Sequence, residues 1–112
     1  MKMYVIHPEG QVQQAEVGRY ALMAMGRQFC EGPVELVSVL FDGKPATMLV
    51  NEIGASADPE LNPKGLLPAN ARATAIYWTA TIQGVTGMPF DPMKAPMIHG
   101  TVVLVDMDKR QL

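Results

Sequence analysis

The sequence is poor in the residues that most catalytic and metal sites require. It has one cysteine, Cys30, and two histidines, His7 and His99. A lone cysteine excludes an internal disulfide and suits a reducing compartment. No Cys-x-x-Cys or His-Glu-x-x-His spacing occurs, so no metal site is predicted, although neighbouring first and last strands would bring the two histidines together.

Motifs for nucleophilic and phosphate chemistry are missing as well. The chain has no Gly-x-Gly-x-x-Gly segment and no phosphate-binding lysine loop, and neither Ser38 nor Ser56 lies in a Gly-x-Ser-x-Gly setting. Cys30 falls at the C-terminal end of a predicted helix, where the helix dipole raises the pKa of a thiol. We expect no catalytic residue and no cofactor, and a non-enzyme is favoured over an enzyme.

Neither basic nor acidic residues dominate. Nine basic and eleven acidic residues give a formal net charge of −2. A protein that reads a nucleic-acid backbone usually has a basic excess, and a DNA mimic needs a far larger acidic excess. No apolar run reaches the roughly 18 residues of a membrane span, and residues 1–10 lack the apolar stretch of a signal peptide. We expect a cytoplasmic protein without nucleic-acid or membrane partners.

Hydrophobic residues are plentiful, at 48% of the chain, and nine of them are methionine. This composition and the length of 112 residues indicate one domain spanning residues 1–112. Methionine fills irregular gaps in a core, but it also builds adaptable binding surfaces, and both interpretations stay open. The broad apolar face predicted for residues 13–30 is compatible with a homo-oligomer.

Hydrophobic periodicity and turn residues predict four strands, at 2–7, 34–41, 46–52 and 97–107, and two helices, at 13–30 and 70–83. Asp42-Gly43 between two apolar runs indicates a β-hairpin. The predicted fold class is α+β, in the order β-α-β-β-α-β. It has one four-stranded, mostly antiparallel sheet and both helices packed on one of its faces. The remaining segments are a long loop at 53–69, a proline-rich loop at 85–96 and a flexible tail at 108–112.

Polar side chains gather where two predicted elements end or begin, and they form the candidate ligand-binding patch: Asn51, Glu52, Asn70, Arg72 and Thr74. The first-turn N–H groups of the second helix, at Ala71 to Ala73, lie beside the Arg72 guanidinium and could hold a phosphate or carboxylate. A structural explanation competes with this one. In it Asn70 caps the helix, Asn51 bonds loop backbone, and Glu52 pairs with Arg72 or Lys64.

Three short motifs are spread along the chain: Asn-Glu-Ile-Gly at 51–54, Leu-Pro-x-Asn-x-Arg-Ala-Thr at 67–74, and Ile-His-Gly-Thr-Val-Val-Leu at 98–104, in the last predicted strand. With the strand at 34–37 they resemble a small domain family of unknown function found in bacteriophage, plasmid and bacterial genomes. The chain departs from that pattern by a longer segment between Gly54 and Leu66 and by the prolines at 88–96. The resemblance implies a mobile-element setting and the same patch of polar residues, without an activity.

Three functions follow as hypotheses. The first is a non-catalytic accessory protein that acts by protein–protein contact, favoured by the missing catalytic motifs and the many methionines. The alternative is a binding module for a small anionic ligand, such as a nucleotide, at the N-terminus of the second helix. The third is an enzyme that uses Glu52 or His99 as a base, for which the sequence offers no partner group.

Overall fold

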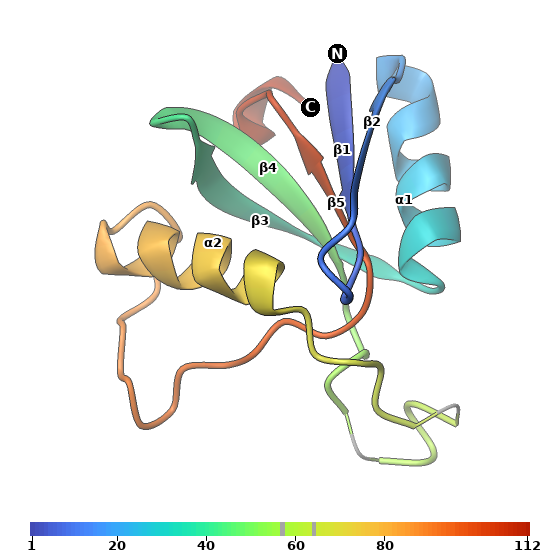
Figure 1. The fold of residues 1–112 in the computed structure, drawn as a ribbon, viewed down its shortest axis with the longest axis vertical. Helices are drawn as coiled ribbons and strands as arrows, with labels where there is room; N and C mark the ends of the chain where they lie inside the picture. The colour runs from blue at the N-terminus through green and yellow to red at the C-terminus, as the bar shows by residue number, and fades with distance from the viewer. Residues whose placement is uncertain (57, 64) are drawn as a thin grey trace.

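The computed structural model describes residues 1–56, 58–63 and 65–112 (Figure 1). Within these ranges five strands form: β1 (Lys2–Ile6), β2 (Val12–Glu16), β3 (Val34–Phe41), β4 (Lys44–Asn51) and β5 (Val102–Val105). The same residues form two α-helices, α1 (Leu22–Cys30) and α2 (Ala71–Ile82), and two short 3-10 turns, η1 (Arg19–Ala21) and η2 (Lys109–Gln111). The segments predicted as the long and the proline-rich loop lie between β4 and α2 and between α2 and β5.

The strands make one sheet in the order β2-β1-β5-β4-β3, and every neighbouring pair is antiparallel. The α+β class and the antiparallel sheet are confirmed, but the prediction of four strands is wrong. Residues 13–16, predicted as the start of the first helix, instead belong to β2 and pair with β1, so that Tyr4 lies opposite Gln14. The turn at Pro8 to Gly10 folds the chain back, and pairing with an existing strand overrides the helix propensity of these residues.

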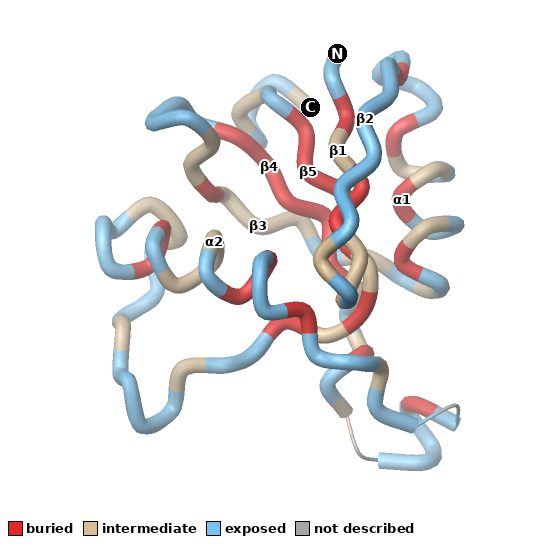
Figure 2. The backbone as a smooth tube through the Cα atoms, in the orientation of Figure 1, coloured by how far each residue is buried: buried red, intermediate tan, exposed pale blue. Residues whose placement is uncertain are grey.

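The prediction that both helices pack on one face of the sheet is also wrong, because α1 and α2 cover opposite faces (Figure 1). Side chains alternate along a strand, so Met48 and Val50 of β4 join the core under α2, whereas Leu49 joins the core under α1. All four residues of β5 are buried, and Figure 2 shows β4 and β5 as the buried centre of the molecule. A strand that is apolar on both faces needs a helix on each side.

Helix α1 is shorter than predicted and begins only at Leu22, after the 3-10 turn η1. It continues without a break through Gly26, although glycine has a low helix propensity. Gly26 is buried against β4, and a Cβ built there would lie 2.5 Å from Leu49 Cδ2. The missing side chain therefore lets α1 approach the sheet, and this close packing offsets the helix propensity that glycine lacks.

The last strand is also shorter than predicted, because only Val102–Val105 of the segment 97–107 join the sheet. Just before it, Gly100 has a φ of +85°, and the chain turns to pair with the segment that leads into α2. Asn70 N donates to Ile98 O at 2.8 Å, and Gly100 N donates to Pro68 O at 2.7 Å. The two irregular connections are thus tied to each other next to the first turn of α2.

Candidate functional site

A hollow of about 350 Å³ opens beside β3. Its floor comes from four consecutive β3 residues, 35–38, and one end comes from Asn51 and Glu52 at the end of β4. Tyr77 of α2 and the connection from Pro96 to His99 form the wall on the α2 side. Apolar and polar groups are mixed in the lining, as they are in many binding sites.

The backbone of β3 is open along this hollow because β3 is the last strand of the sheet. Glu52 N donates to Pro33 O at 2.9 Å. With the register of the two strands, this bond shows which residues of β3 turn their N–H and C=O groups toward β4. In an antiparallel pair every second residue turns its N–H and C=O toward the partner strand. The odd-numbered residues of β3 therefore face β4, and the N–H and C=O groups of Leu36, Ser38 and Leu40 face outward.

A second hollow of about 320 Å³ continues along the same edge, at Ser38 to Leu40. Val85 lines it from the α2 side, and Lys109 lines it from η2 on the other side of the strand. Ser38 and Lys109 line both hollows, so the two hollows are neighbours along the edge of β3. We call the edge of β3 at residues 35–40 with these two hollows the β3 groove.

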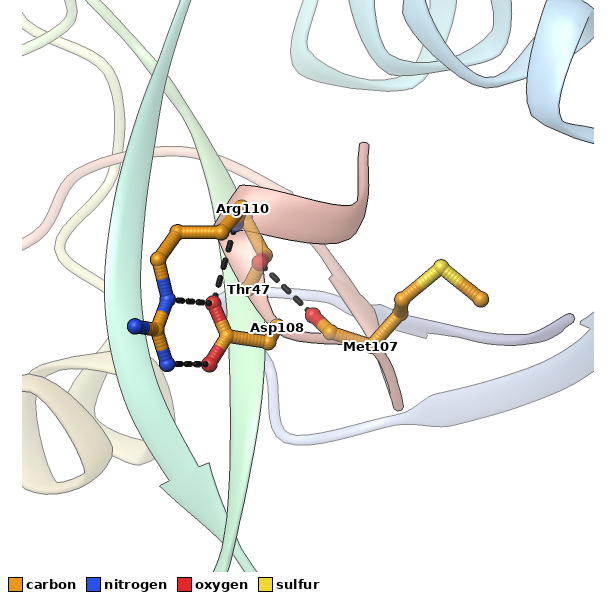
Figure 3. Close-up of polar contacts among 4 residues, drawn as sticks. All are labelled: Thr47, Met107, Asp108 and Arg110. Atoms are coloured by element: carbon orange, nitrogen blue, oxygen red, sulfur yellow. Dashed lines mark hydrogen bonds and ion pairs between the residues drawn. The ribbon is translucent and has the colours of Figure 1, made fainter.

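The wall at η2 is held by a small polar cluster, drawn in Figure 3. The buried Thr47 hydroxyl donates to Met107 O at 2.8 Å, which ties the segment after β5 to β4. Asp108 then caps η2 by accepting from Arg110 N at 2.9 Å, and the Arg110 guanidinium lies 3.1 Å from its second oxygen. Hydrogen bonds from Arg110 lower the pKa of Asp108 below its usual value. Residues 108–112, predicted as a flexible tail, thereby place Lys109 at the β3 edge.

The β3 groove has both acidic and basic side chains in its lining. Glu35 and Glu52 are exposed acidic residues in the first hollow, and Lys109 is the basic residue that both hollows share. His99 also reaches the first hollow, where its Nδ1 donates to Leu67 O at 2.8 Å. In the described part of the chain no side-chain hydrogen bond joins His99 to either carboxylate.

Asn51 and Glu52 are the two predicted patch residues that the hollow contains. The Asn51 amide donates to Cys30 O at 2.8 Å and its oxygen accepts from Ile53 N at 2.9 Å, which confirms the prediction that Asn51 bonds loop backbone. The ion pair predicted between Glu52 and Arg72 is not formed among the residues described, and Lys64 lies outside them. Glu52 is instead exposed at the mouth of the hollow.

The other three patch residues lie at the start of α2, and this hollow does not include them. Asn70 is fully buried and caps α2 as predicted, since its oxygen accepts from Ala73 N at 3.0 Å. The Thr74 hydroxyl donates to Asn70 O and accepts from Ile98 N, and Arg72 is exposed. One of the N–H groups predicted to hold an anion, that of Ala73, thus already has a protein partner, and the anion site stays a prediction.

Several residues of the groove have no counterpart among the sequence predictions, namely Glu35, Ser38, Tyr77, Met97 and Lys109. Their patterns indicate ordinary strand, helix and tail positions. The missing information was the place of β3 at the edge of the sheet, which depends on strand order. A hairpin strand that follows a helix can lie at the edge of a sheet or in its interior, and the hydrophobic pattern of residues 34–41 fits either position.

The buried thiol of Cys30 offers a check on the core beneath α1. Burial raises the pKa of Cys30 from 9.0 to about 12, while its Sγ lies 3.4 Å from Leu49 O. We expect native protein at pH 8 to react with iodoacetamide at least a hundredfold more slowly than urea-unfolded protein, as followed by mass spectrometry. Because the folded pKa is the higher one, this thiol should also reduce the free energy of unfolding as pH rises from 9.0 toward 12. Equal labelling rates in the two states would contradict the packing.

Comparisons with protein-family models, with curated proteins and with solved structures find no match. No group of three or more metal-ligating side chains gathers in the ranges 1–56, 58–63 and 65–112. Among these residues, no helix combines the length and the apolar character that crossing a bilayer requires.

Proposed function

We propose that this chain is a cytoplasmic, non-catalytic accessory protein that acts by protein–protein contact, and that the β3 groove is its contact surface. The observation that supports this most directly is the open edge of β3, with two neighbouring hollows along it that residues of the α2 side and Lys109 of η2 line. The mobile-element setting of the proposal rests on the sequence resemblance of residues 51–54, 67–74 and 98–104.

The wall on the α2 side has the character of a protein-binding surface. Met88 and Met97 line the first hollow with 59% and 46% of their surface exposed. Trp78 and Phe90 pack edge to face nearby, with ring centroids 6.0 Å apart, and the Trp78 indole donates to Pro96 O at 2.7 Å. Flexible methionines beside anchored aromatic rings can adapt to an apolar side chain of a partner.

A matched pair of substitutions tests the proposal. Met97→Glu places a carboxylate in the apolar wall of the groove beside Glu35 and Glu52, so it should oppose the burial of a partner's apolar side chain. Met93 lies in the same connection, is 90% exposed and lines neither hollow of the groove. We expect immobilised wild-type protein and Met93→Glu to retain the same partner from host lysate, and Met97→Glu to retain at least tenfold less, as measured by quantitative mass spectrometry.

Two results would count against the proposal. One is that no protein is retained by the wild type at micromolar concentration. The other is that Met97→Glu and Met93→Glu retain the same proteins in equal amounts, which would move the contact surface away from the groove. Circular dichroism melts of both variants verify that neither exposed substitution has unfolded the chain.

A further inference from the structure

We infer that the β3 groove takes one extended segment of the partner as a sixth strand of the sheet. This inference rests on the proposed function and adds the mode of binding and the chemistry of the segment. Recognition by strand addition uses main-chain hydrogen bonds for affinity and side-chain pockets at alternate positions for specificity. The β3 groove offers both.

The outer edge of β3 presents main-chain hydrogen-bonding groups at a regular spacing. The outward N–H and C=O groups of Leu36, Ser38 and Leu40 recur at every second residue, about 6.8 Å apart. No backbone or side-chain hydrogen bond joins residues 34–41 to anything but β4 within the part of the chain described. Donor and acceptor pairs at this spacing match the backbone of another strand.

The walls of the groove distinguish β3 from the other edge of the sheet. At that edge all five residues of β2 are exposed, and Figure 2 shows the whole strand at the surface. Along β3, Tyr77 and Val85 line the groove on one side of the strand, and Lys109 lines it on the other side. Such walls admit a single strand and obstruct the edge-to-edge approach of a second whole sheet, so a peptide segment is favoured over a second copy of this chain.

The side chains set the chemistry of the segment. Val37 and Glu35 lie on the α2 face of β3, two residues apart. A strand residue opposite Val37 would point at the apolar wall formed by Tyr77 and Met97. The residue two positions away would stand opposite Glu35, with Glu52 nearby, where a lysine or arginine is electrostatically favoured. The segment is therefore extended and carries an apolar residue and a basic residue separated by one position.

A phage-displayed library of random nine-residue peptides is selected on the 112-residue chain, and the enriched peptides are resynthesised for titration. Ser38→Pro removes one outward N–H and leaves the β4 ladder intact, because proline is tolerated where the N–H of an edge strand faces solvent. Gln14→Pro makes the same change at the β2 edge, since the Met1–Val17 bonds turn the N–H of Gln14 outward. We expect Ser38→Pro to weaken peptide binding at least tenfold and Gln14→Pro to change it less than twofold.

Two further measurements do not depend on the proline variants. Bound peptide should slow hydrogen exchange at the amides of Leu36, Ser38 and Leu40 in the wild type. Selection on Glu35→Lys should replace the basic position of the enriched peptides by an acidic one. Strand addition is overturned by a library without enriched peptides, by equal binding to Ser38→Pro and Gln14→Pro, or by protection at Gln14 in place of Ser38. If Met97→Glu abolishes partner recovery while Ser38→Pro leaves it intact, the proposed function survives and only this mode of binding fails.

Discussion

Replacing Asn70 by alanine is expected to lower the free energy of unfolding by about 2–4 kcal/mol, one of the two largest effects we predict for a single substitution. The Asn70 amide donates to Ile6 O at 3.0 Å and to Gly100 O at 2.9 Å, while its oxygen caps α2 at Ala73 N. One buried side chain thus connects β1, the segment before β5 and α2. Loss of the cap costs about 1 kcal/mol, and the loss of the two buried hydrogen bonds to the carbonyl groups accounts for the rest.

Asn62→Ala is the matched control for this experiment. Asn62 is also buried and also makes three side-chain hydrogen bonds, to Ile53 O, Ser56 O and Gly65 O, but all three lie within the connection between β4 and α2. We expect its loss to cost at most about 1 kcal/mol, because no strand or helix depends on it. Urea unfolding followed by circular dichroism measures both variants. Equal destabilisation by the two substitutions would refute the connecting role of Asn70.

The second large effect is expected for Gly100→Ala, at about 2–4 kcal/mol. Gly100 has a φ of +85°, and a Cβ there would lie 2.8 Å from Leu67 Cδ1. Two costs therefore add: an unfavourable backbone conformation, about 1–2 kcal/mol, and the displacement of the half-buried Leu67 side chain, about 1–2 kcal/mol. Gly100 N and O both make hydrogen bonds, to Pro68 and Asn70, so the backbone cannot relax without breaking them.

Gly10→Ala separates the two costs. Gly10 has a φ of +97°, and an added Cβ would have no atom within 4 Å. It should therefore show the backbone cost alone, and the difference between the two variants reports the contact with Leu67. A Leu67→Ala, Gly100→Ala double variant should recover part of the difference in a double-mutant cycle. A Gly100→Ala protein as stable as Gly10→Ala would show that Leu67 is not packed against residue 100.

Local signals in the sequence were sufficient for several elements. Asp42-Gly43 predicts the hairpin between β3 and β4, and both residues have positive φ, as a two-residue turn of this kind requires. Asn70 predicts the start of α2, because its side chain acts within one helical turn. In each case the interaction that fixes the structure lies between residues a few positions apart.

Long-range pairing explains what the sequence did not predict. The strand Val12–Glu16 is exposed on both faces, so no alternation marks it, and only the ladder to β1 holds it extended. The two-sided core had a visible signal in the uniformly apolar Val102–Val105, which is typical of a strand between two helix layers. The candidate site was predicted in part for the same reason. Asn51 and Glu52 stand out by type, whereas Ser38 and Lys109 gain their place only from strand order.

The central position of β5 has a consequence for synthesis of the chain. The β1–β2 and β3–β4 pairs each join neighbouring segments, but β5 inserts between β1 and β4 and is the last strand to be made. We expect the two hairpins to stay unjoined on the ribosome until Val105 has left the exit tunnel, after which the sheet closes in a single late step. Nascent chains halted before that point would expose both halves of the core to chaperones.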